Sequence, residues 1–248
     1  MYNNIFPDER FSLFEERIGY LFKNKKLLRA ALTHSSFANE MKSRGVTVPC
    51  NERLEFLGDS VISLITAHYI FDLYPKENEG DLTKLRSLAV RDIALSEYAR
   101  ELGMGECLML GRGEDNPEGR GRRSTLENAF EALTGAIYLD GGLEAATAFV
   151  RPFIERKVHS TVASGENRDY KTILQQIVQM EQGERLEYVL VGESGPDHCK
   201  QFEVEAHLNH NVIGRGVGPR KIAAEQMAAK EALGYFGYPD CFRDKKAK

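Results

Sequence analysis

Hydrophobic residues recur every three to four positions along the first part of the chain, the spacing of helices with one buried face. The pattern is found in residues 14–33, 53–74, 81–103 and 125–142. The last of these stretches ends at Gly141–Gly142, and glycine readily adopts the left-handed conformation that ends many helices. The Gly-rich, charged run at 111–123 predicts a surface connection. We therefore expect an all-α domain.

The pattern changes after a small, polar run, STVASGENR at 160–168, whose composition is typical of a linker. One helix is predicted over 169–181, strands over 187–194, 201–209 and 211–216, and a final helix that begins near Pro219. In the middle strand, apolar residues alternate with polar ones, the period of a half-buried strand. The order α-β-β-β-α predicts a small α+β domain.

We therefore expect four segments. They are a helical domain at 10–160, a linker at 161–168, an α-β-β-β-α domain at 169–238 and a basic tail at 239–248.

Composition narrows the class of protein without indicating a function. The chain has 248 residues, of which 42% are hydrophobic and 28% charged, as in soluble globular proteins. It contains no run of 18 apolar residues, and its start lacks the basic-then-apolar order of a signal peptide, so we expect a cytoplasmic protein without a membrane span. Its four cysteines form no CxxC pair, which disfavours a zinc site. The net charge of −4 does not by itself suggest nucleic acid.

The most informative stretch is NERLEFLGDS at 51–60. On a helix Glu52, Glu55 and Asp59 share one face, while apolar residues that include Leu57 and Leu64 face a core. No Lys or Arg stands three or four residues away, and like charges at such spacing cost roughly 0.2–0.5 kcal/mol per pair. A chain that keeps this repulsion is expected to hold a cation there. The alternative interpretation is a solvated acidic face.

Further acids strengthen the case for a cation. Asn128 and Glu131 share a face on a helix whose other positions are apolar, and Glu79 lies in a loop-like segment. Carboxylates are rarely buried unpaired, and oxygen ligands suit a hard cation such as Mg²⁺.

These segments resemble the ribonuclease III family. NERLEFLGDS is similar to the family signature, and the likeness continues in THSS (33–36), EGDLTKLRS (79–87), LGRGE (110–114) and STLENAFEALTGAIYLDGG (124–142). It covers roughly residues 15–237. The resemblance implies a dimeric helical nuclease domain that cleaves double-stranded RNA with a water activated by Mg²⁺, for which Mn²⁺ can substitute. It also implies 5′-phosphate and 3′-hydroxyl ends with short 3′ overhangs.

The resemblance assigns roles to individual residues. Asp59 and Glu131 match the catalytic pair, with Glu52 and Glu79 as supporting acids. The residues that match metal-binding positions are Glu55, Asp59, Asn128 and Glu131. Asn128 departs from the pattern, since an Asp is usual there, and the site loses one negative charge. Phe56 matches an aromatic residue of the dimer interface; the alternative interpretation is a core phenylalanine.

The second domain resembles a double-stranded RNA-binding domain, a module that reads the shape of the duplex across two minor grooves. The matching segments are 169–179, 195–206 and 219–233. Matching positions toward the first minor groove are Thr172, Gln175, Gln176 and Gln179. His198 would enter the next groove, and Arg220 and Lys221 would meet phosphates at a helix amino-terminus. Ile222 stands where a second lysine is usual.

The resemblance as a whole predicts a cytoplasmic, homodimeric endoribonuclease that processes ribosomal and other structured RNA. Two alternatives remain open. One is a catalytically impaired protein that binds double-stranded RNA, for which Asn128 argues. The other is a structural dimer, against which the unpaired acids argue.

Overall fold

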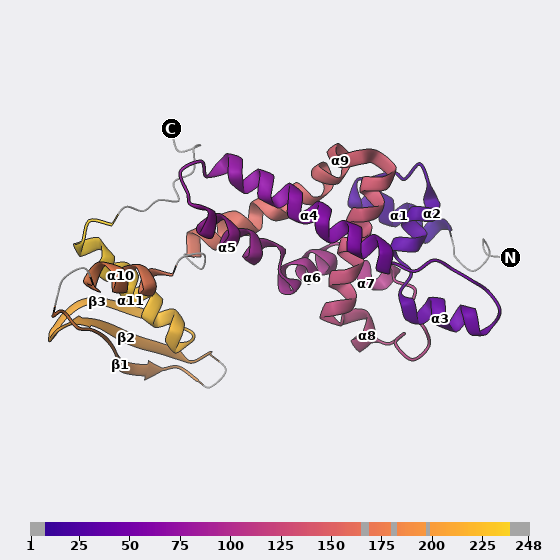
Figure 1. Ribbon diagram of the computed structural model, residues 1–248. Helices are drawn as coiled ribbons and strands as arrows, with labels where there is room; N and C mark the ends of the chain where they lie inside the picture. Colours follow the sequence, from indigo (N-terminus) through magenta and orange to yellow (C-terminus); the bar gives the residue numbers. More distant parts are fainter. Residues whose placement is uncertain (1–7, 165–168, 180–182, 197–198, 239–248) are drawn as a thin grey trace. The chain divides into compact units, whose positions relative to one another are not determined.

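The computed structural model describes residues 8–164, 169–179, 183–196 and 199–238 (Figure 1). The chain divides into two compact units; the first contains the described residues up to Ser164 and the second those from Asp169 onward. The predicted linker and basic tail fall largely or wholly outside the described residues, so the proposed domain boundaries stay predictions.

The first unit is helical, as predicted. Its helices are α1 (Asp8–Ile18), α2 (Lys25–Ala31), α3 (Ser35–Ser43), α4 (Glu52–Leu73), α5 (Glu79–Val90), α6 (Asp92–Glu101), α7 (Met104–Cys107), α8 (Pro117–Gly121) and α9 (Arg123–Ser164). The long helices α4 and α9 pack against each other, and α6 packs against α9 (Figure 1). An aromatic cluster of Tyr98, Phe130, Phe149 and Phe153 joins α6 to α9, with ring centroids 5.2–5.9 Å apart.

Two glycines allow the backbones of α4 and α9 to touch. A Cβ atom on Gly58 would lie 1.8 Å from the backbone oxygen of Glu131, and one on Gly135 would lie 2.3 Å from that of Leu54. No side chain fits at either position. The first turns of α4 are therefore fixed against one turn of α9.

The predicted helix stop at Gly141–Gly142 is confirmed. Gly142 has φ 79° and ψ −175°, so α9 consists of two helical segments that meet at this residue. Because a positive φ is costly for residues with a Cβ, glycine is the residue suited to this sharp change of direction.

Three details differ from the sequence-based expectations. Two predicted helices are divided. Within residues 14–33, α1 ends at Ile18 and α2 begins at Lys25. Within residues 81–103, Arg91 is extended (φ −68°, ψ 157°) and separates α5 from α6. Glu79 is not in a loop; it is the first residue of α5, whose N-cap Asn78 accepts a hydrogen bond from the backbone N–H of Asp81. Leu64 is not in the core of the chain, since 57% of its surface is exposed.

The second unit has the predicted α-β-β-β-α order. It consists of α10 (Tyr170–Gln179), β1 (Leu186–Ser194), β2 (Gln201–Leu208), β3 (Asn211–Gly218) and α11 (Lys221–Tyr235). The strands form an antiparallel sheet in the order β1-β2-β3. Helix α11 begins two residues after Pro219, with Arg220 as its N-cap.

The predicted alternation in β2 is confirmed, because Val204 and Ala206 are fully buried in the core of the second unit. Helix α10 contributes Leu174 to this core. On β3, Gly214 and Gly216 let α11 approach the sheet, because a Cβ at either position would lie within 2.3 Å of a backbone oxygen of α11.

Among the described residues, α4 is the one helix long and apolar enough to cross a membrane by length and composition. The core helix of a soluble protein meets the same criterion. Helix α4 carries two glutamates in its first turn and packs on α9.

Replacing Gly58 with Ala is expected to destabilise the first unit by about 3 kcal/mol, the upper part of the range for overpacking, because the new methyl group would collide with the backbone at Glu131. Urea unfolding measures the loss. The control is Gly121→Ala, where a Cβ meets nothing within 4 Å. That variant should stay within about 0.5 kcal/mol of the parent. Equal effects of the two substitutions would contradict the close contact between α4 and α9.

Candidate active site and RNA-binding surface

The acids of α4 stand on the side of the helix that its core residues leave open. Glu52 and Asp59 are exposed and Glu55 is half-buried, whereas Leu54 and Gly58 are buried. The start of the helix is held in place because the backbone N–H of Asn51 donates to the Thr33 oxygen at 2.8 Å.

On α9, Glu131 is only 8% exposed and lies at the contact with Gly58. Asn128 and Glu127 are half-buried and precede it by about one turn. Side chains on a helix lean toward its amino-terminus, so these three residues share one region of the surface of α9. The glycine contact places that region beside the first turns of α4.

The electrostatics show that the two sets of acids meet. Burial and then, in decreasing order, the charges of Asp59, Glu127 and Glu55 together raise the pKa of Glu131 to about 8. Burial also raises the pKa of Glu55, as do Glu52 and Glu127, while a hydrogen bond with the Asn128 side chain lowers it. In the described part of the chain, no Lys or Arg forms an ion pair with Glu55, Glu127 or Glu131.

The donor set fits a hard divalent cation. Within the described residues, no group of three or more His, Cys, Asp or Glu side chains is arranged to hold a metal ion as it stands. Mg²⁺, however, keeps several water ligands and often uses only one or two carboxylates. A cation would also offset the repulsion that raises the pKa of Glu131. The oxygen chemistry and the charge of this cluster therefore suit Mg²⁺.

The structure thus brings together Glu55, Asp59, Asn128 and Glu131, with Glu52 beside Glu55. Glu79 is placed elsewhere within the chain. It lines a cavity with Phe71 of the carboxyl-terminal half of α4, and its carboxylate accepts a hydrogen bond from Thr83 at 3.1 Å. Its supporting role stays a prediction.

One acid of the cluster, Glu127, was missed by the sequence reasoning. The signal that could have found it is its spacing, since it stands four residues before Glu131 and so on nearly the same face of the helix.

Phe56 is 79% exposed, so the interpretation as a core phenylalanine is wrong. Leu64 and Phe71 are further exposed apolar residues of α4. Large apolar side chains exposed along one helix are typical of a surface that binds a partner.

The THSS and LGRGE segments lie side by side and support the site without joining it. The His34 backbone N–H donates to the Met109 oxygen at 3.0 Å, and the Gly111 N–H donates to Ser36 Oγ at 3.0 Å. Because Thr33 also holds the start of α4, these segments fix the frame from which α4 projects its acids.

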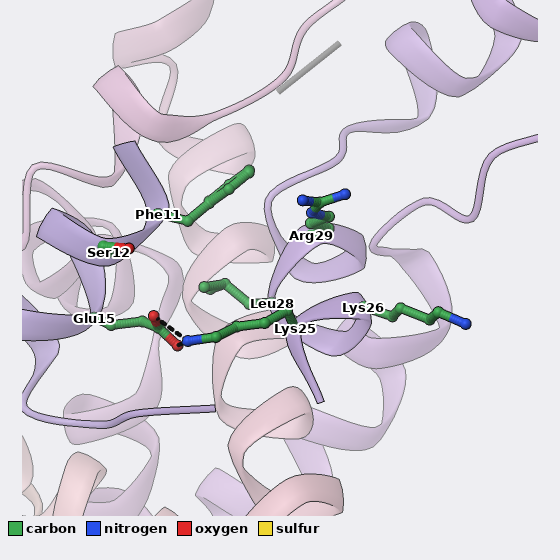
Figure 2. Close-up of a pocket in the computed structure, with 7 residues that line it drawn as sticks. All are labelled: Phe11, Ser12, Glu15, Lys25, Lys26, Leu28 and Arg29. Carbon is green, nitrogen blue, oxygen red and sulfur yellow. Dashed lines mark hydrogen bonds and ion pairs between the residues drawn. The ribbon is translucent and has the colours of Figure 1, made fainter. Parts of the chain in front are cut away.

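A separate cavity of about 400 Å³ lies between α1 and α2 (Figure 2). Figure 2 shows Glu15 paired with Lys25 at its wall. Glu15 also accepts a hydrogen bond from the Phe22 N–H at 2.8 Å, so its buried charge is satisfied. None of the predicted site residues lines this cavity.

In the second unit the predicted groove residues form one exposed face of α10. Thr172, Gln175, Gln176 and Gln179 are all exposed, while Leu174 on the opposite side is buried. Asp169 fixes the start of the helix by accepting a hydrogen bond from Thr172 Oγ1 at 2.8 Å.

The predicted phosphate contacts lie at the start of α11. Arg220 and Lys221 are exposed there, where the backbone N–H groups of the first turn face outward. His198 lies outside the described residues, and its predicted role stays untested.

Comparisons with known proteins agree with both units. A profile described as Ribonuclease-III-like matches residues 24–158, and one described as Double-stranded RNA binding motif matches residues 170–235. Ribonuclease 3 from Pelotomaculum thermopropionicum is 43% identical over 229 residues, 92% of this chain and 94% of that protein. Ribonuclease 3 from Bacillus licheniformis is 44% identical over 225 residues, 91% and 89% of the two chains.

A solved structure shows the same fold for the first unit. It is the nuclease domain of ribonuclease III from Campylobacter jejuni, described for flexibility in a region involved in dimer formation. The match has a TM-score of 0.53 at 38% identity and covers 58% of this chain and 95% of that one.

A helical unit with clustered acids, followed by a double-stranded RNA-binding motif, defines the class of endoribonucleases that act on double-stranded RNA. The chain belongs to the ribonuclease III family, as its sequence segments predicted.

Replacing Glu131 with Gln is expected to stabilise the protein in EDTA. The pKa of Glu131 in the folded state, about 8, exceeds the ordinary value of 4.5, so the folded protein loses stability as pH rises from 4.5 toward 8. Glutamine removes this loss of stability, which is on the order of 4 kcal/mol at pH 8.

Urea unfolding at pH 5 and pH 8 measures the gain, which should be present at pH 8 and small at pH 5. The control is Glu144→Gln, at an exposed position of the same helix. A Glu131→Gln variant that matches the parent at both pH values would contradict the burial of an uncompensated charge.

Proposed function

We propose that this endoribonuclease hydrolyses duplex RNA at the acidic cluster with Mg²⁺, for which Mn²⁺ can substitute. Glu55, Asp59, Asn128 and Glu131 would hold the ion, and Asp59 and Glu131 would be the catalytic pair. The observation that carries the proposal is Glu131, which is buried beside other acids and has no ion pair with any described Lys, Arg or His. When bound, the metal ion lowers the pKa of a water molecule and offsets charge on the phosphate.

The residues of the cluster would have different roles in catalysis. Glu131 is buried, so its position is fixed by the packing of α9. Asp59 is exposed and faces the side from which an RNA strand can approach. The Asn128 side chain donates a hydrogen bond to the Glu55 carboxylate, which stabilises the charged form of Glu55 within the cluster. Attack of water on phosphorus breaks the bond to O3′ and leaves 5′-phosphate and 3′-hydroxyl ends.

We further propose that the active form is a homodimer in which each subunit cuts one strand. The exposed Phe56 stands on the same helix as the acids, one residue from Glu55. Apolar surface beside a polar site suits a second copy of the chain, which would bring two acidic clusters to one duplex. The expected substrates are ribosomal and other structured RNA in the cytoplasm.

The second unit would hold the duplex by its shape. The exposed face of α10 offers hydroxyl and amide groups for 2′-hydroxyl groups in a minor groove. Arg220 and Lys221 would bind phosphates. Residues 168–248 contain 12 Lys and Arg against 12 Asp and Glu, a net charge of zero. One copy of this part of the chain would therefore bind RNA weakly, and a dimer gains from having two copies.

The second candidate is a catalytically impaired protein that binds double-stranded RNA. Asn128 favours it, because a carboxamide gives the ion less charge than a carboxylate. Cleavage of a long, fully paired duplex by the purified protein, with and without Mg²⁺, separates the two candidates.

Asp59→Asn and Glu131→Gln are each expected to lower the cleavage rate by at least about a hundredfold, because each removes charge that acts on the transition state. Binding of the duplex, measured in EDTA, should stay nearly unchanged since other residues make those contacts. Glu144→Gln again serves as the control. A rate of a tenth of the parent's would show that the catalytic pair is misplaced.

Lys221→Ala and Gln175→Ala should weaken duplex binding in different ways. Loss of a phosphate contact lowers the slope of log affinity against log salt by about 1, whereas loss of a groove contact leaves this slope unchanged. Titrations at several salt concentrations measure both effects. The control is Arg185→Ala, an exposed cation paired with Glu187 at 2.7 Å. Identical slopes for Lys221→Ala and the parent would remove Lys221 from the phosphate-binding surface.

A further inference from the structure

Glu127 is a half-buried carboxylate of the acidic cluster that takes no part in the proposed chemistry. It has no hydrogen bond or ion pair in the described part of the chain. Arg123, one turn before it on α9, forms its ion pair with Asp92 at 3.3 Å. The charge of Arg123 lowers the pKa of Glu127, but burial and the charges of Asp92 and Asp59 raise that pKa overall. A half-buried carboxylate whose charged form is disfavoured costs stability, so its position calls for an explanation.

The helix register places Glu127 next to the catalytic position. At about 100° per residue, Glu127 and Asn128 lie on either side of Glu131, roughly 40° and 60° away around the axis of α9. Because α4 contacts α9 at Glu131, both positions border the first turns of α4. Glu127 accordingly interacts electrostatically with Glu55 and Asp59 of α4 as well as with Glu131.

A separate observation points to a cation at this place. Glu131 is 8% exposed, and no described Lys, Arg, His or backbone N–H pairs with its carboxylate. Its strongest electrostatic neighbours are Asp59, Glu127 and Glu55, all of them acids. A positive ion would stabilise the charged form of a buried carboxyl group whose strongest charged neighbours are all acids.

We propose that Glu127 is a carboxylate of the metal site that supplies, from one position earlier on α9, the negative charge that Asn128 lacks. The inference rests on the proposed metal-dependent function. The side-chain oxygen of Asn128 would bind the ion, while its amide N–H donates a hydrogen bond to Glu55. Glu127 would restore the total negative charge of the cluster. Glu127 acts on the ion by its charge and is a positioning residue, not a catalytic one.

The experiment measures the binding of Mn²⁺ to the full-length protein without RNA, by the electron paramagnetic resonance signal of unbound Mn²⁺. Glu127→Gln should weaken the affinity about tenfold, since one charge close to the ion is lost. Glu144→Gln, on the same helix, should leave the affinity unchanged. Asn128→Asp should strengthen it about tenfold. The double variant E127Q/N128D, which has the parent's net charge, should return within about twofold of the parent.

A Glu127→Gln variant that binds Mn²⁺ as tightly as Glu144→Gln overturns the inference. So does a double variant that binds as tightly as Asn128→Asp alone, because the charge of Glu127 would then be irrelevant. The Asp59→Asn variant shows whether a negative result contradicts only the role of Glu127 or the proposed metal site as a whole. If Asp59→Asn abolishes binding while Glu127→Gln does not alter it, only the role of Glu127 is wrong. If Asp59→Asn also binds normally, the metal site itself is misplaced.

Discussion

The backbone contact between α4 and α9 is the constraint on which the active site depends. Gly58 and Gly135 carry no side chain, so the two helices meet backbone to backbone at Glu131. A helix pair separated by ordinary side chains would hold its axes farther apart. The acids of α4 and α9 would then lie too far apart to hold the single ion of the proposed function. The two glycines thus convert two separate amphipathic helices into one site.

The close approach of α4 and α9 lowers the stability of the metal-free protein. Burying Glu131 beside Asp59 raises the pKa of its carboxyl to about 8, which means that the charged form is disfavoured in the metal-free protein. The rest of the first unit compensates with a tightly packed core, in which Phe130 and Leu133 on the opposite side of α9 are fully buried. The strain is therefore local, and the buried face of α9 fixes the position from which its acids act.

The two units recognise RNA by different physical means. In the proposed function, the clustered negative charge of the first unit would act through a cation, so a net charge of −4 is compatible with a nucleic acid substrate. In the second, a polar helix face and the exposed start of α11 present hydrogen-bonding groups and two cations at fixed positions. In the proposed function, shape and a few placed charges would thus bind duplex RNA without a general basic balance.

The sequence by itself determined the two folds, the helix stop at Gly142 and the set of acids on α4, because these follow from periodicity, glycine chemistry and a specific family resemblance. It did not determine which residues meet. The exposure of Phe56, the position of Glu79 away from the other acids and the place of Glu127 beside Glu131 depend on how α4, α5 and α9 pack. Such contacts join residues far apart in the chain, and local patterns carry no information about the distance between two helices. Only the tertiary structure, through the contact at Gly58, decided which carboxylates share one site.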